Sequence, residues 1–162
     1  EIIDNGPLRL TFRLTYEPYS VGEDTVTETR TISLDAYSLF NKVTHLFKTD
    51  REILTVATGI VTDATETPVT HTEESGIIAY QNPENKANGT IYTAAIHPEG
   101  YEATKLLNGH IAGLNNIETG KPYTCYVGGG WSKAGFNSFD DWVAFLKTEK
   151  EKINQPFTID IQ

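Results

Sequence analysis

Apolar and polar residues alternate along much of this chain, and the alternation predicts β-strands. Over residues 8–16, apolar side chains at every second position are separated by arginines and threonines. A period of two is typical of a strand with one buried face. Residues 25–34 place threonine and serine on one face and mainly apolar side chains on the other. The same reasoning predicts further strands at 38–47, 53–61, 76–81, 90–97, 109–117, 121–127 and 156–161.

Turn-forming pairs separate these stretches, among them Asn82-Pro83, Asn88-Gly89 and Thr119-Gly120. About nine short strands with a turn roughly every dozen residues are typical of all-β proteins. We therefore predict a mainly β fold, an antiparallel β-sandwich that forms one domain over residues 1–162.

One amphipathic helix is predicted near the C-terminus, over residues 138–153. Ser138 is a good N-cap, and Asp141 follows it in the capping-box position. Trp142 belongs to the apolar stripe, so we expect it in the core. Gln155-Pro156 ends the helix. The apolar stripe consists of Phe139, Trp142, Val143, Leu146 and Ile153.

Composition excludes some functions. The 162 residues carry 13 Lys plus Arg against 22 Asp plus Glu, a net charge of −9. Nucleic-acid binding depends on clustered cations, so nucleic acid is not expected as a partner. No apolar run approaches the roughly 20 residues that span a bilayer, so membrane insertion is not expected either. The chain lacks methionine, and we expect it to be a segment of a longer protein.

The segment from Gly128 to Lys133 is the most informative candidate for a site. Three consecutive glycines follow a predicted strand and allow a sharp bend or a close approach of another group. Trp131 and Lys133 follow them directly. Trp131 either closes the end of the sandwich or stacks on a sugar ring, whose C–H faces are apolar. Tyr126 and Tyr80 complete the candidate binding residues in the second interpretation.

Two charged residues interrupt an otherwise apolar strand face. Glu28 and Arg30 are two positions apart in the strand at 25–34, so they point the same way. Charges on such a face must be paired or open to a cleft. They form either a structural ion pair or the floor of a binding groove in which Arg30 holds substrate charge.

His97 and His110 are the candidates for proton transfer. Each lies at the end of a predicted strand, where site residues often occur, and an imidazole titrates near neutral pH. Glu28 is the candidate carboxylate beside them. The four histidines of the chain show no metal-binding spacing, and neither a metal nor a cofactor is expected.

Four segments together resemble a known family. They are 4–7 (DNGP), 29–36 (TRTISLDA), 56–61 (VATGIV) and 126–133 (YVGGGWSK). The family is one of uncharacterised function, found in secreted or periplasmic proteins of polysaccharide-degrading bacteria, and it is similar to the galactose-mutarotase-type β-supersandwich. Family domains are longer, so the resemblance implies that this chain matches their C-terminal half.

The resemblance implies a role on carbohydrates, with uronic-acid glycans as one class, and a periplasmic or secreted location. An enzyme of this kind would hydrolyse, lyse or epimerise a glycan. The alternatives are a non-catalytic carbohydrate-binding module and a scaffold half whose site lies elsewhere. The expected partner is an oligosaccharide or polysaccharide, or the N-terminal portion of the same protein. No catalytic motif of the mutarotase group matches this sequence, so no catalytic role is transferred.

Overall fold

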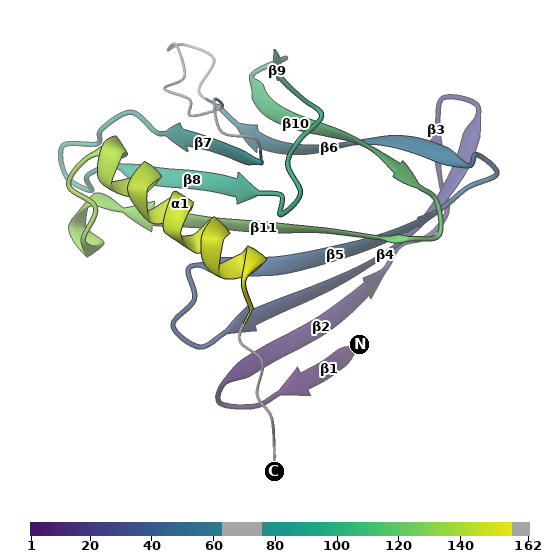
Figure 1. Cartoon of the computed structure of the whole chain (residues 1–162), viewed down its shortest axis with the longest axis horizontal. Coiled ribbons are helices and arrows are strands. Elements are labelled where there is room, and N and C mark those ends of the chain that lie inside the picture. The colour runs from purple at the N-terminus through teal and green to yellow at the C-terminus, as the bar shows by residue number, and fades with distance from the viewer. Residues whose placement is uncertain (63–75, 157–162) are drawn as a thin grey trace.

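The structure is a computed structural model that describes residues 1–62 and 76–156 (Figure 1). Within these residues the chain forms two antiparallel sheets and one α-helix, which confirms the predicted mainly β sandwich. The predicted strand at 156–161 lies, apart from Pro156, outside the described residues. Residues 62–75 are rich in Thr, Asp, Glu and Pro, which predicts an acidic surface loop, and nearly all of them also lie outside the described residues. None of the described helices is long and apolar enough to cross a membrane.

The larger sheet has eight strands in the described part of the chain. Their order is β1-β2-β4-β5-β11-β8-β7, and β3 pairs with β4 off this path. The smaller sheet has the order β6-β10-β9. The strands of the larger sheet are β1 (Ile2–Asn5), β2 (Arg9–Thr15), β3 (Tyr19–Val21), β4 (Asp24–Asp35), β5 (Phe40–Lys48), β7 (Ile77–Gln81), β8 (Ile91–Ile96) and β11 (Pro122–Trp131). Those of the smaller sheet are β6 (Ile53–Val61), β9 (Ala103–Leu107) and β10 (His110–Glu118).

Three short strands, β1, β3 and β9, were not predicted from the sequence. β1 and β3 have four and three residues, too few for the alternation to stand out, and β9 has five. β9 and β10 form a hairpin across Asn108-Gly109, whose φ angles of 50° and 72° are those of a tight turn between strands. The Asn-Gly pair was therefore a usable signal for β9.

The predicted helix is present as α1 (Phe139–Asn154). The Ser138 side chain accepts a hydrogen bond from the Asp141 backbone N–H, so Ser138 is its N-cap as expected. Trp142 is fully buried, also as expected. It packs with Phe40, Ile77 and other residues of β7, β8 and β11.

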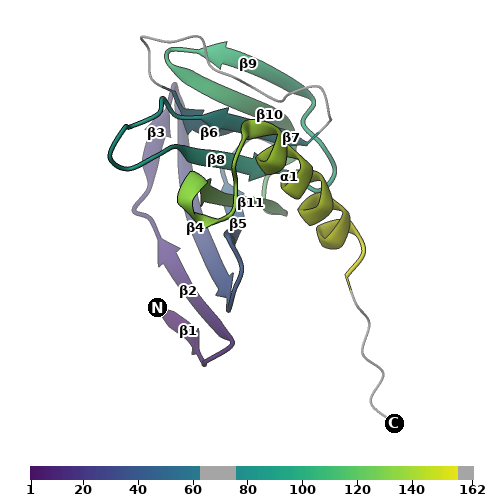
Figure 2. The same cartoon turned by 90° about the vertical axis from the view of Figure 1, so that its left-hand side faces the viewer.

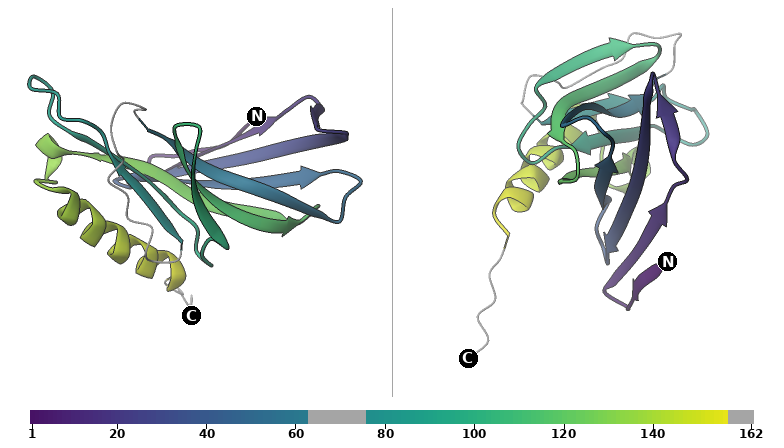
Figure 3. Two further views of the ribbon diagram at one scale, coloured as in Figure 1. Left: turned by 90° about the horizontal axis from the view of Figure 1, so that it is seen from above. Right: turned by 90° about the vertical axis from the view of Figure 1, so that its right-hand side faces the viewer.

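Helix α1 and the smaller sheet cover opposite faces of the larger sheet. Ile77 and Ile78 are adjacent in β7, so their side chains point to opposite faces. Ile77 belongs to the core under α1, whereas Ile78 packs against Ile60 and Ile111 of the smaller sheet. Figure 3 shows α1 and the smaller sheet on either side of β7 and β8. Strands β1 and β2 lie at the end of the larger sheet far from α1 (Figure 2).

Candidate functional site

The glycine run at 128–130 lies inside β11 and does not form a bend. The strand continues through all three glycines and ends at Trp131. The absence of side chains here serves close approach, the other use of glycine considered from the sequence. A Cβ atom at Gly128 would collide with the backbone oxygen of Leu39, and one at Gly130 would lie 2.8 Å from the Phe136 ring.

The indole of Trp131 is held in a fixed orientation at the end of β11. It is 42% exposed. Its Nε1 donates a hydrogen bond to the Asn88 carbonyl oxygen at 2.6 Å. Lys133 donates from Nζ to the Ala87 carbonyl oxygen at 2.6 Å, and this ammonium lies 5.7 Å from the centre of the indole. The loop at 82–90 and the turn after β11 therefore position the ring together.

Trp131 forms one wall of a surface hollow of about 710 Å³, which we call the Trp131 hollow. Apolar and amide side chains share its lining, together with the backbone of the glycine run. This combination of an aromatic plane and amide groups can bind a ring that has an apolar face and a polar edge. Its main side chains are those of Leu39, Asn82, Asn85, Asn88, Ile91 and Phe136.

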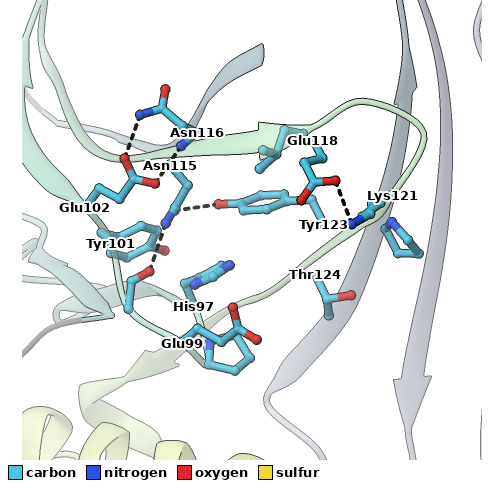
Figure 4. Close-up of a pocket in the computed structure, with 14 residues that line it drawn as sticks. His97, Glu99, Tyr101, Glu102, Asn115, Asn116, Glu118, Lys121, Tyr123 and Thr124 are labelled. Atoms are coloured by element: carbon cyan, nitrogen blue, oxygen red, sulfur yellow. Dashed lines mark hydrogen bonds and ion pairs between the residues drawn. The ribbon is translucent and has the colours of Figure 1, made fainter. Parts of the chain in front are cut away.

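A second hollow, of about 570 Å³, lies where the end of β8 meets the start of β11 (Figure 4). We call it the His97 hollow. His97 is only 7% exposed, and its ring stacks on Tyr123 with 5.0 Å between centroids. Burial lowers the pKa of His97. Asn115 donates from Nδ2 to the Gly100 carbonyl oxygen at 2.9 Å and accepts a hydrogen bond from the Tyr123 hydroxyl at 3.2 Å.

Glu28 and Arg30 form a hydrogen-bonded cluster with His45 in which Glu28 is buried and Arg30 is about one-third exposed. Glu28 is 6% exposed. Its Oε1 accepts from Arg30 Nη2 at 2.8 Å and Nε at 3.0 Å, and lies 2.9 Å from His45 Nδ1. The Tyr19 hydroxyl donates to Glu28 Oε2 at 3.2 Å. Burial opposes ionisation of Glu28, but the hydrogen bonds from His45 and Arg30, with the charge of Arg30, outweigh it and hold the pKa of the carboxyl below its ordinary value.

His45 is the member of this cluster that sequence reasoning missed. The β4–β5 register places His45 directly opposite Arg30. Its position in β5, two residues from Val43 and two from Phe47, put it on the buried face, and that was the available signal. The partner strand could not be known from the sequence, so the pairing could not be predicted.

The other predicted site residues are scattered over the fold. His110 is exposed, and its Nδ1 lies 2.8 Å from the Asn108 carbonyl oxygen. Tyr80 is 1% exposed and lies in the core between the sheets, so its ring has no open face. Tyr126 and Trp131 have opposite parity in β11, and Tyr126 packs beside the core under α1. These three aromatic residues therefore do not form one platform.

The predicted acid–base residues and Trp131 do not converge either. His97 stacks on Tyr123, and Glu28 contacts His45, which lies opposite Tyr123 in the β11–β5 register. Trp131 is eight positions further along β11 than Tyr123. That separation is about 26 Å of extended chain. Among the residues that the structure describes, no group of three or more His, Cys, Asp or Glu side chains gathers as a metal site would require.

The described residues thus form a two-sheet β-sandwich with surface hollows near the ends of its strands. A family model described as "Domain of unknown function (DUF4861)" matches residues 1–159. The chain belongs to this family, which confirms the predicted membership in a family of uncharacterised function.

Two further similarities extend the comparison. Uncharacterized protein P7 of Formosa agariphila is 25% identical over 169 residues, covering 99% of this chain and 41% of that protein. A structure of a putative kojibiose phosphorylase from the human microbiome matches with a TM-score of 0.66 at 12% identity, over 92% of this chain and 21% of that one. At this identity the match shows a shared fold. The chain thus spans less than half the length of each of these two proteins.

Proposed function

We propose that this chain is a carbohydrate-binding domain that holds a sugar ring against the indole of Trp131. The observation that carries the proposal is the geometry of this ring, which is partly exposed, fixed through Asn88 and turned toward a hollow with amide side chains. The apolar C–H face of a sugar packs on an aromatic plane, and its hydroxyl groups bond with amides.

Two similarities support the proposal. The structural neighbour is named a putative kojibiose phosphorylase, and kojibiose is a disaccharide. The sequence resemblance likewise implies a carbohydrate role. On the same resemblance we propose a periplasmic or secreted location and a place in the C-terminal part of a longer protein.

Binding, rather than catalysis, is the activity that fits the Trp131 hollow. The described residues that line it include no carboxylate, imidazole or thiol, so no acid–base pair faces a bound ring. An enzymatic role through Glu28, His97 or His110 therefore concerns other parts of the molecule and stays a prediction.

Lys133 decides between neutral and acidic sugars. The lining of the hollow is uncharged, which suits a neutral ring, but the Lys133 ammonium lies beside the indole. A uronic-acid ring bound with its carboxylate toward Lys133 would gain a charge-assisted hydrogen bond. Replacing Lys133 by Gln should then weaken uronate binding and leave neutral oligosaccharides unaffected.

The two tryptophans of the chain provide the readout. Trp142 is fully buried and Trp131 is partly exposed, so acrylamide should quench mainly Trp131. We expect neutral oligosaccharides, kojibiose among them, or oligogalacturonates to protect Trp131 from quenching and to bind with measurable heat in calorimetry. Trp131→Ala should weaken this binding about tenfold or more, a loss of about 1.4 kcal/mol or more, and Trp131→Phe should weaken it less.

The control is Leu106→Ala, which removes an exposed side chain on the smaller sheet and should leave binding intact. Circular dichroism should show that Trp131→Ala remains folded, because the indole is partly exposed at the end of β11 and belongs to none of the core clusters. Binding that survives Trp131→Ala unchanged, or no binding across both sugar classes, would overturn the proposal.

A further inference from the structure

A third hollow, of about 600 Å³, opens between the two sheets. We call it the His45 hollow. Its floor is the face of the larger sheet formed by β2, β4, β5 and β11, and its other wall is β6, at the edge of the smaller sheet. It shares no lining residue with the Trp131 hollow, so the two can be tested separately. Most of its lining side chains are apolar, namely those of Phe12, Ile32, Val43, Phe47, Val56, Ala57, Cys125 and Val127.

Two neighbouring side chains give the His45 hollow a polar end. Arg30 in β4 and His45 in β5 lie directly opposite each other in the register of the two strands, so their Cβ atoms are about 5 Å apart. Both contact Glu28, which fixes their orientation. The His45 ring also stacks on Phe47, with 5.4 Å between centroids and 8° between planes. The two polar groups are therefore held in place before a ligand binds.

His45 offers a hydrogen-bond acceptor to the hollow. Its Nδ1 lies 2.9 Å from Glu28 Oε1. The pKa of the Glu28 carboxyl is below its ordinary value, so this group is a carboxylate that can only accept, and Nδ1 is the protonated nitrogen. Burial lowers the pKa of His45, so the ring is neutral near pH 7 and Nε2 keeps its lone pair. Nε2 has no partner in the described part of the chain and is not closed to solvent.

Arg30 offers a donor beside this acceptor. Its Nε and Nη2 bond with Glu28, whereas Nη1 makes no hydrogen bond with any described residue. The side chain is about one-third exposed and lines the hollow, so Nη1 is open to a ligand. A hydroxyl group that accepts from Nη1 and donates to His45 Nε2 would satisfy both atoms. The charges of Glu28 and Arg30 balance each other, so an anionic ligand finds no spare counter-charge in this hollow.

The other polar side chains of the hollow do not suit a ring with many hydroxyls. The hydroxyls of Thr58 and Tyr123 bond with each other at 2.9 Å. The amide of Asn41 lies four residues from His45 in β5, about 13 Å along an extended strand. A sugar has hydroxyls on most of its ring carbons, and several would face the apolar walls without partners, which costs free energy. An apolar ring with one hydroxyl fits better.

We infer that the His45 hollow binds a phenol-type ligand, an aromatic ring with one hydroxyl group. The hydroxyl bonds with Arg30 and His45, and the ring packs against the apolar walls. Phe12 and Phe47 in these walls favour an aromatic ring, because aromatic pairs gain more than the burial of their area alone. This assignment and sugar binding at Trp131 stand or fall separately, because either hollow can be occupied alone.

Phenol, anisole, benzoate and glucose are the probes. Calorimetry measures binding, and NMR locates it through the methyl signals of Val43 and Val56. Anisole keeps the ring and the oxygen but has no proton to donate to His45, so it should bind about tenfold more weakly than phenol. Benzoate brings a charge that the hollow does not balance, and it should also bind more weakly than phenol. Glucose should leave the two valine signals unshifted.

His45→Phe separates the hydrogen bond from the packing. It keeps a ring against Phe47 and removes Nε2, so phenol should bind about tenfold more weakly and lose its advantage over anisole. His110→Phe, at an exposed position, is the matched control and should keep the preference for phenol. The comparison of phenol with anisole in the unaltered protein tests the inference even where His45→Phe does not fold.

Three results would overturn the inference. They are anisole binding as tight as phenol binding, a preference for phenol that a folded His45→Phe variant retains, and valine shifts with glucose as large as those with phenol.

Discussion

The imidazole of His97 and the phenol ring of Tyr123 lie face to face, with centroids 5.0 Å and planes 19° apart. The Tyr123 hydroxyl in turn accepts from Thr58 at 2.9 Å and donates to Asn115 at 3.2 Å, both on the smaller sheet. On its other side Tyr123 lies opposite His45, the partner of Glu28. One side chain thus joins the two sheets and lies between the His97 hollow and the Glu28 cluster.

Removing the hydroxyl of Tyr123 should destabilise the sandwich. Tyr123→Phe keeps the ring against His97 but leaves the buried Asn115 Oδ1 without its donor, which costs about 1–3 kcal/mol. Urea unfolding followed by circular dichroism measures the loss. Tyr16→Phe is the control, because no hydrogen bond from the Tyr16 hydroxyl is present among the described residues, and the change should stay within about 0.5 kcal/mol. Equal stability of the two variants would show that the Tyr123 bonds contribute nothing.

Breaking the Glu28 cluster should cost more. Glu28→Ala leaves Arg30 and His45 without their shared acceptor, and removing one partner of a buried ion pair costs about 3–5 kcal/mol. Arg30 is one-third exposed, so solvent screening favours the lower end of that range.

The exposed Arg9–Asp35 pair on β2 and β4 is the comparison. Both of its side chains are more than half exposed, so Asp35→Ala should cost at most about 1 kcal/mol. The free energies of unfolding of Glu28→Ala and Asp35→Ala, each compared with that of the unaltered protein, test this difference. A Glu28→Ala loss as small as that of Asp35→Ala would mean that the cluster is solvated.

A methyl group at Gly128 should also be destabilising. Gly128→Ala forces the new Cβ against the backbone oxygen of Leu39, and overpacking of this kind costs about 1–3 kcal/mol. Gly59→Ala is the matched control in β6, because its Cβ would lie 3.8 Å from the nearest atom, the Ile111 backbone oxygen. We expect a lower thermal midpoint for Gly128→Ala alone. Equal midpoints would remove the close approach at β11 as the reason for the glycine run.

Local patterns were enough to predict most of the secondary structure. Alternation and the turns between strands predicted the eight strands other than β1, β3 and β9, and the Ser138 cap with the spacing around Trp142 predicted the helix. Period two also placed Glu28 and Arg30 on one face, and the structural ion-pair interpretation agrees with their contact. These inferences succeed because each depends on residues a few positions apart.

Contacts that depend on which strands pair, and in which register, could not be predicted from the sequence. His45 meets Arg30 only because β5 pairs with β4 in one register, and Tyr123 meets His97 only because β11 pairs with β8. The sequence left a bend and a close approach open at the glycine run, and only the pairing of β11 with its neighbouring strands decides for the close approach. Tyr80 was assigned to a binding surface for its chemistry alone, whereas the smaller sheet covers it.

Stability should fall as the pH decreases from about 7.5 to 5.5. Burial lowers the pKa of both His45 and His97, and for His45 the hydrogen bond with Glu28 only partly opposes this. In the unfolded chain both imidazoles titrate at about pH 6.5. Between that value and the lowered folded pKa the unfolded state binds more protons, so the stability that is fully present above pH 6.5 is lost as the pH falls. Each histidine contributes at most about 1.4 kcal/mol per pH unit.

Glu28 does not affect the pH dependence in this range. Its pKa is lowered in the folded state, so the stability that it contributes is lost only below its ordinary pKa of 4.5. The charge of Lys150 disfavours the protonated form of His97, and that of Glu99 favours it. Likewise, Arg30 disfavours the protonated form of His45, and Glu28 favours it. His97→Gln should therefore flatten the dependence of the unfolding free energy on pH, whatever it does to the stability at pH 7.5. Leu106→Ala, an exposed change that removes no titratable group, is the control and should keep the slope of the unaltered protein. A slope that His97→Gln leaves unchanged would mean that the imidazole at the base of the hollow is open to protons in the folded state.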